Sequence, residues 1–161
     1  MGISLLNEDF EKIFNKAKAR KRVFRVIVAL DHIAIAVPDL EKSIKRFMDD
    51  FGLTYKGRED VDSAKTSTAF FPLPETQIEL VHPLNGEGPI QKFLEKKGGG
   101  IHHLCFRSDN IEEDVARLKE KGYQFLSEAP TLGAHNCKVI FIHPKSCDGV
   151  LIELNQPMDS H

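Results

Sequence analysis

The sequence predicts one α+β domain in which two βαβββ modules, arranged in tandem, form a curved, cup-like mixed sheet with helices on the outside. Three observations support this fold: an internal repeat, strand-like alternation of apolar residues, and a helix start at the same place in each repeat. A chain of 161 residues is long enough for one such domain. We expect the domain at residues 29–156, divided into module 1 (29–83), a linker helix (84–99) and module 2 (100–156), with an N-terminal extension at 1–28 and a tail at 157–161.

The first repeated element is a short strand with a histidine at its third position. Residues 30–37 read LDHIAIAV, and residues 101–108 read IHHLCFRS. Alternate residues of a strand share one face, so His32 shares a face with Ala34 and Ala36. The apolar residues between them then face a helix.

A helix follows each of these strands. Asp39 stands seven residues after His32 and Asn110 seven after His103, and both residue types favour helix N-caps. Apolar residues with helical spacing follow each cap, namely Leu40, Ile44, Phe47, Met48 and Phe51 in the first half and Ile111, Val115 and Leu118 in the second. Gly52 and Gly122 stand where a left-handed helix end is expected.

Each half ends in a similar tripeptide, Ile-Glu-Leu, at residues 78–80 and 152–154. Each half therefore offers one histidine and one glutamate on the strand face opposite the apolar residues. These four side chains, which we expect to point into the concavity of the cup, are His32, Glu79, His103 and Glu153. Two imidazoles and two carboxylates suit a single divalent transition metal such as Co, Mn, Zn, Ni or Fe, and leave its identity open.

Two segments lie outside the repeat. Residues Leu5 to Arg22 are expected to form an amphipathic basic helix that is an appendage packed on its own domain or on a neighbour. Between the modules, Pro89 to Lys97 are expected to form a short helix that ends at three consecutive glycines, residues 98–100.

Composition excludes several classes of partner. With 22 basic and 24 acidic residues the formal net charge is −2, which gives no basic surface of the kind that nucleic acids require. No apolar run approaches the roughly 20 residues of a membrane helix. The three cysteines, Cys105, Cys137 and Cys147, form no pairing motif and indicate a reducing compartment. We therefore expect a cytoplasmic protein that binds neither nucleic acid nor membrane.

Four segments carry a resemblance to a known family: LDHIAIAV, TQIEL, GGGIHHLCF and HPKSCDGVLIEL. They resemble the vicinal oxygen chelate superfamily, which includes glyoxalases, bleomycin resistance proteins and dioxygenases, over residues 29–156. Within it, GPIQKFLEKKGGGIHHL and HPKSCDGVLIELNQ are similar to methylmalonyl-CoA epimerases. The resemblance implies metal ligation by His32, Glu79, His103 and Glu153, whereas the neighbouring His102 and Gln77 do not occupy ligand positions.

The same resemblance implies a reaction. Epimerisation of methylmalonyl-CoA removes the C2 proton and returns it on the opposite face through a metal-stabilised enolate. Glu153 and Glu79 are the expected bases, one for each face. The strand that precedes TQIEL, Lys65 to Phe71, lacks the separate acidic base of some epimerases, so the partner of Glu153 is either Glu79 or water ordered by Thr68. The expected substrate is an acyl-CoA, and a homodimer is expected because superfamily members usually pair.

Two other functions stay open at this point. One is a glyoxalase I-like lactoylglutathione lyase, which needs a similar metal and base. The other is a non-catalytic binding or resistance protein of the same fold, although such proteins often lack the metal ligands. Two further residues share the face of His103: Arg107 forms either a salt bridge at the rim or a clamp for a substrate carboxylate, and Cys105 is a small filler beside the metal.

Overall fold

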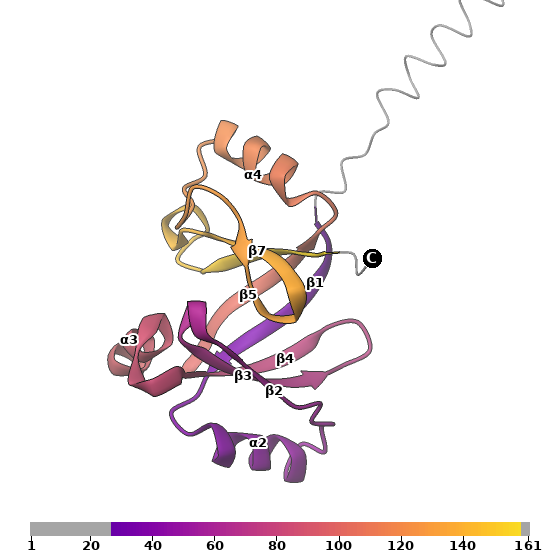
Figure 1. The fold of residues 1–161 in the computed structure, drawn as a ribbon, viewed down its shortest axis with the longest axis vertical. Coiled ribbons are helices and arrows are strands. Elements are labelled where there is room, and N and C mark those ends of the chain that lie inside the picture. Colours follow the sequence, from indigo (N-terminus) through magenta and orange to yellow (C-terminus); the bar gives the residue numbers. More distant parts are fainter. Residues whose placement is uncertain (1–26, 159–161) are drawn as a thin grey trace, which may run out of the picture.

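The computed structural model describes residues 27–158, so the amphipathic helix expected at Leu5 to Arg22 lies outside the described residues. Eight strands form one sheet in the order β2-β3-β4-β1-β5-β8-β7-β6 (Figure 1). The strands of module 1 are β1 (Ile27–Ala36), β2 (Arg58–Val61), β3 (Thr66–Pro72) and β4 (Gln77–Pro83). Those of module 2 are β5 (Gly100–Ser108), β6 (Thr131–Leu132), β7 (Cys137–Ile142) and β8 (Ile152–Pro157).

The pairing of the strands repeats the internal symmetry of the sequence. Strand β1 pairs in parallel with β4, and β5 pairs in parallel with β8, whereas the remaining neighbours are antiparallel. The two modules meet where β1 and β5 pair antiparallel in the middle of the sheet. The predicted fold, two βαβββ modules in one curved mixed sheet, is confirmed.

Both predicted helix starts are confirmed. Helix α2 (Leu40–Asp49) begins at Asp39, whose Oδ1 accepts a hydrogen bond of 3.0 Å from the backbone N–H of Lys42. Helix α4 (Ile111–Glu120) begins at Asn110, whose Oδ1 accepts one of 3.1 Å from the N–H of Glu113. Each cap satisfies a backbone donor that the helix itself leaves free.

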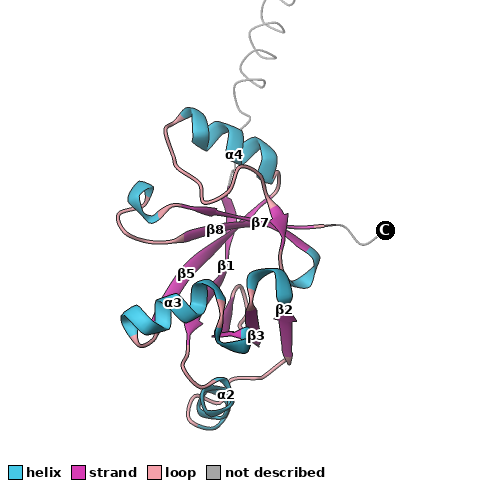
Figure 2. Ribbon diagram, turned by 60° about the vertical axis from the view of Figure 1, so that its left-hand side comes forward, coloured by secondary structure: helices cyan, strands magenta, loops and turns pink. Residues whose placement is uncertain are grey.

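Each of these helices covers the outer face of its own module, and the two lie at opposite ends of the molecule with the strands between them (Figure 1, Figure 2). Beneath α2, Leu40 and Ile44 pack on Leu80 and Phe71 of the sheet. The core beneath α4 consists of Ile111, Val115, Ile140, Ile142 and Leu154. The apolar residues that pack beneath the two helices therefore point outward, as predicted, on the face opposite the four candidate ligands.

The linker helix α3 (Gly88–Lys97) packs on the inner face of the sheet, unlike α2 and α4. Its Ile90 packs against Ala34, Ala36 and Val81, which share the sheet face of His32 and Glu79. The helix ends at Gly98, which has a left-handed φ of 76°. At Gly99 a Cβ atom would lie 3.2 Å from the carbonyl oxygen of Ala36, so glycine permits the close approach of the linker to β1. Helix α3 thus closes one end of the cup.

None of the helices between residues 27 and 158 is long and apolar enough to cross a membrane.

Candidate metal centre

The four predicted ligands lie on the four inner strands of the sheet. Glu79 is on β4, His32 on β1, His103 on β5 and Glu153 on β8, and these strands are adjacent in that order. All four residues are buried, with exposed fractions between 5% and 8%. The fold therefore brings together residues that are far apart in the sequence.

Three of the four side chains converge on one point. The Nε2 atoms of His32 and His103 are 3.2 Å apart, and Oε2 of Glu153 lies 2.8 Å from Nε2 of His103 and 3.7 Å from Nε2 of His32. Ligand atoms that surround a divalent transition metal at about 2.0–2.2 Å lie about 3.0–3.5 Å from one another. The donor set and its spacing therefore fit a divalent metal.

Glu79 lies beside this group on the other side of the His32 ring. Its Oε1 is 3.4 Å from Nδ1 of His32 and accepts a hydrogen bond of 2.8 Å from Nε2 of Gln77. Among the described residues, the groups whose ligand atoms all lie within 4.8 Å of one another do not include Glu79. The Glu79 carboxylate thus lies close to the three converging atoms but is hydrogen-bonded to Gln77.

The environment shifts the pKa values of the two carboxylates in opposite directions. For Glu153, burial raises the pKa, but hydrogen bonds from His103 and His32 outweigh burial and lower it to about 2. For Glu79, burial dominates over the nearby charge of His32 and raises the pKa to about 7. Near neutral pH, Glu153 is ionised while Glu79 exchanges readily between its two protonation states.

A buried carboxylate that the sequence analysis did not assign to the site also touches His32. Oδ1 of Asp31 lies 3.0 Å from Nδ1 of His32, and Oδ2 of Asp31 accepts hydrogen bonds of 2.9 Å and 2.6 Å from Nε and a terminal nitrogen of Arg107. Arg107 is half-exposed, so of its two expected roles the structure shows the salt bridge at the rim. One feature of the sequence could have identified Asp31: it is an acidic residue inside an otherwise apolar strand, directly before His32.

Asp31 and His32 each stabilise the charged form of the other. Burial raises the pKa of Asp31, but hydrogen bonds with His32 and Arg107 lower it to about 2. Burial lowers the pKa of His32, but hydrogen bonds with Asp31 and Glu153 raise it to about 10. A metal that binds at His32 therefore competes with a proton for the ring.

Asp31, His32 and Cys105 form a second group of possible ligand atoms. A cysteine binds metal as the thiolate, and burial raises the pKa of Cys105, which keeps its thiol protonated. Since Cys105 is fully buried, it fills space beside the site, as expected from the sequence.

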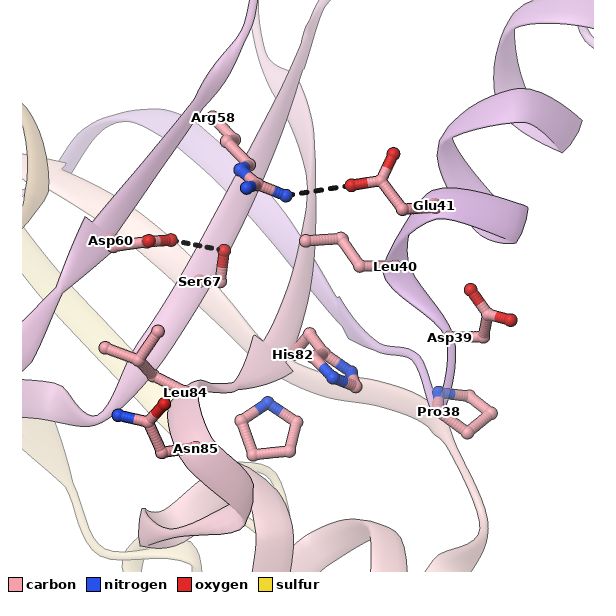
Figure 3. A pocket seen from close by; sticks show the side chains of 11 residues that line it. Pro38, Asp39, Leu40, Glu41, Arg58, Asp60, Ser67, His82, Leu84 and Asn85 are labelled. Carbon is pink, nitrogen blue, oxygen red and sulfur yellow. Dashed lines mark hydrogen bonds and ion pairs between the residues drawn. The ribbon is translucent and has the colours of Figure 1, made fainter.

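Two cavities of about 480 Å³ lie elsewhere. The first, at the start of α2, is lined by none of the four predicted ligands. Three of its charged side chains already have partners, since Arg58 donates a hydrogen bond to Glu41 and Asp60 accepts one from Ser67 (Figure 3). The second lies between α3, the start of β5 and the loop before β8, and His102 forms part of its wall. Of the two, the second adjoins the metal centre, because Nδ1 of His102 is 2.8 Å from Nδ1 of His103.

Comparison with known proteins agrees with this geometry. The sequence profile of the Glyoxalase/Bleomycin resistance protein/Dioxygenase superfamily matches residues 31–141. The chain belongs to this superfamily. Human mitochondrial methylmalonyl-CoA epimerase is 45% identical over 128 residues, which cover 79% of this chain and 73% of the human protein. The ethylmalonyl-CoA/methylmalonyl-CoA epimerase of Cereibacter sphaeroides is 43% identical over 133 residues, which cover 81% of this chain and 99% of that protein.

A solved structure of the superfamily shows the same fold. Methylmalonyl-CoA epimerase from Mycobacterium tuberculosis superposes with a TM-score of 0.81 at 35% identity and covers 88% of this chain and 96% of that one. The resemblance that the four sequence segments indicated is thereby confirmed. The two curated relatives and this structure are all named as epimerases of methylmalonyl-CoA, one of them also of ethylmalonyl-CoA.

Proposed function

We propose that this chain catalyses the epimerisation of methylmalonyl-CoA with the help of one divalent metal. The observation that carries the proposal is the buried convergence of His32, His103 and Glu153, one histidine from each module, in a chain that is 45% identical to an epimerase. The chain is an enzyme of the epimerase class, and its substrate is a small acyl-CoA molecule.

Nε2 of His32, Nε2 of His103 and a carboxylate oxygen of Glu153 would hold this metal, with Glu79 as the proposed fourth ligand. When bound, such a metal supplies Lewis acidity to two substrate oxygens, which favours loss of the C2 proton. Co, Mn, Zn, Ni and Fe all suit two imidazoles and two carboxylates. Glu79 lies 3.4 Å from Nδ1 of His32, on the side of the ring opposite Nε2, so its carboxylate would have to turn toward the metal to become a ligand.

The protein's own contribution is the movement of protons. Glu79 and Glu153 lie near opposite edges of the His32 ring, since Glu79 approaches Nδ1 and Glu153 approaches Nε2. An ionised carboxylate takes the C2 proton from one face, and a protonated one returns a proton to the other face. The ionised Glu153 and the raised pKa of Glu79, about 7, match these two roles. After one turnover the two protonation states are exchanged, and this form of the site acts on the opposite epimer. Proton exchange with water restores the first form for another forward turnover.

Burial of the site also protects the carbanion-like intermediate. The four residues are at most 8% exposed, and the inner face is closed at one end by α3. Exclusion of bulk water strengthens electrostatic stabilisation of the developing enolate and limits unspecific protonation.

The test is deuterium exchange at C2 of methylmalonyl-CoA in D₂O, catalysed by the metal-loaded chain, together with conversion of one epimer to the other. A glutathione hemithioacetal is offered to the same preparation. We expect exchange and epimerisation with the thioester and little turnover of the hemithioacetal. Turnover of the hemithioacetal alone would instead identify a lactoylglutathione lyase, and binding without turnover of either a sequestering protein.

We further propose that the protein is a homodimer and is located in the cytoplasm. The three free cysteines support a reducing compartment, whereas the human relative is named as a mitochondrial protein. Light scattering on the purified chain and fractionation of the source cells test these two points separately.

A further inference from the structure

Two of the three irregularities in the pairing of β1 with β5 stand at equivalent places of the two modules. The register passes from Leu30–Phe106 to His32–Cys105, which leaves Asp31 without a partner, and from Ala34–His103 to Ile35–Ile101, which leaves His102 without one. Each unpaired residue directly precedes one of the predicted ligand histidines. A β-bulge allows a strand to point two successive side chains toward one region, which regular alternation forbids.

Each bulge residue contacts the same atom of the histidine that follows it. Oδ1 of Asp31 lies 3.0 Å from Nδ1 of His32, and Nδ1 of His102 lies 2.8 Å from Nδ1 of His103. The opposite nitrogens, the two Nε2 atoms, face one another across the boundary between the modules at 3.2 Å. In both modules, therefore, Nδ1 is occupied by the preceding residue and Nε2 is directed to the shared centre.

We propose that Asp31 and His102 are a pseudosymmetric pair of positioning residues, which accept the Nδ1–H of His32 and His103 and thereby present both Nε2 lone pairs to the metal. This inference rests on the proposed metal site. A neutral imidazole carries one proton, so an acceptor at Nδ1 fixes that proton there and leaves Nε2 free as a ligand. Partners of this kind orient a ligating histidine and raise its basicity.

The surroundings of each positioning residue suit its role as an acceptor. Arg107 binds Oδ2 of Asp31 through two nitrogens, which leaves Oδ1 for His32 and compensates the buried charge. His102 packs edge-to-face against Phe93 of α3, with ring centroids 5.0 Å apart, and this contact fixes the plane of its ring. Its Nδ1 accepts when its own proton is on Nε2. The two modules thus use different acceptors, an anionic carboxylate and a neutral imidazole, for one task.

The test measures binding of Co²⁺ to the full, metal-free chain by competition with a chelator, together with the visible spectrum of the Co²⁺ complex. Asp31→Ala and His102→Ala should each weaken Co²⁺ binding about 10-fold to 100-fold and change the spectrum, because the ligand histidine loses its partner. Asp31→Asn keeps an oxygen acceptor, and His102→Gln offers an amide oxygen in place of the ring nitrogen, so both should recover part of the affinity. These conservative variants also serve if an alanine variant fails to fold.

Two matched variants control for general destabilisation. Asp114 is a buried carboxylate that pairs with Arg117 and accepts a hydrogen bond from Ser108, away from the metal centre. His82 is a partly buried histidine whose Nδ1 bonds the carbonyl oxygen of Val37. Asp114→Ala and His82→Ala should leave Co²⁺ affinity within about twofold of the original protein.

A second measurement needs no substitution. Long-range ¹H–¹⁵N spectra of the Zn²⁺-loaded chain should show a proton on Nδ1 and metal on Nε2 in both His32 and His103. Metal on Nδ1 of either ring would overturn the proposal.

The outcomes separate this inference from the metal site itself. If His32→Ala abolishes Co²⁺ binding while Asp31→Ala and His102→Ala bind like the original protein, the positioning role is wrong and the metal site stands. If the original protein binds no Co²⁺, both are wrong. Epimerase activity is decided independently by the C2 exchange assay.

Discussion

The two modules share one architecture and differ in the chemistry that surrounds each histidine. In module 1, His32 is enclosed by two carboxylates, Asp31 and Glu79, at Nδ1. In module 2, His103 has the imidazole of His102 at Nδ1 and Glu153 at Nε2. The repeat thus supplies the geometry twice, but two carboxylates lie at Nδ1 of His32 whereas an imidazole lies at Nδ1 of His103. The proposed epimerisation, which needs one base and one acid, would use this asymmetry.

The largest expected effect comes from the carboxylate of module 2. Glu153→Gln keeps an oxygen ligand but removes a proton acceptor, so epimerisation should fall about a hundredfold to ten-thousandfold while substrate affinity changes far less. The rate is measured by conversion of one epimer to the other, with metal content determined on the same sample. A variant with full metal content and near-normal turnover would remove Glu153 from the mechanism.

The equivalent change in module 1 should separate the two faces of the substrate. Glu79→Gln leaves Glu153 able to remove and return a proton on its own side, so C2 exchange of one epimer should continue while inversion falls about a hundredfold. Exchange and inversion are followed in the same D₂O reaction. Gln77→Ala, which removes the hydrogen bond to Glu79 and leaves the carboxylate in place, is the control. If both rates stay near those of the original chain, the second proton carrier is water, ordered by the buried Thr68.

The carboxylates around His32 should also make the free energy of unfolding of the metal-free chain depend on pH. The folded pKa of His32 is raised to about 10 from an ordinary value near 6.5, so its contribution is fully present below pH 6.5 and is lost as pH rises through 10. Urea unfolding at pH 6.5 and pH 9.5 should therefore show a loss of stability that His32→Gln reduces. An equal loss in both proteins would contradict the ion pairs assigned to His32. His82→Gln is a control outside the site.

The smallest expected effect concerns the helix N-caps, a feature that the two modules share. Asp39→Ala and Asn110→Ala each remove one helix N-cap and should each lower the free energy of unfolding by about 1 kcal/mol. Urea unfolding at one pH measures both. A loss confined to one variant would show that α2 and α4 contribute unequally to the fold, and neither variant should alter Co²⁺ affinity.

Sequence patterns predicted most of the fold because the patterns are local. The caps at Asp39 and Asn110 and the apolar spacing after them act within one helix, and the alternation of residues in a strand places His32 and Glu153 on the inner face. Because the sequence repeats, each of these patterns occurs once in each module. Nothing local, however, indicates that α3 packs on the inner face near Ala34, because the linker has no counterpart in the repeat.

The same argument explains which site residues the sequence did not reveal. Strict alternation directs Asp31 and His102 away from the histidines beside them, and the bulges that turn them back depend on the register between β1 and β5. That register joins residues 71 positions apart, as His32 and His103 are, so no sequence window contains it. The hydrogen bond from Gln77 to Glu79 likewise depends on side-chain rotation, which periodicity does not describe.

The order of the strands has a consequence for the lifetime of the site. Strands β4, β1, β5 and β8 are each hydrogen-bonded on both sides, whereas β2 and β6 form the two edges of the sheet. Local opening of a sheet begins at edges and ends, and its inner strands exchange their amide protons last. Fraying of β2 or β6 therefore leaves His32, His103 and Glu153 in register, so the candidate metal centre keeps its geometry while the edges of the sheet open.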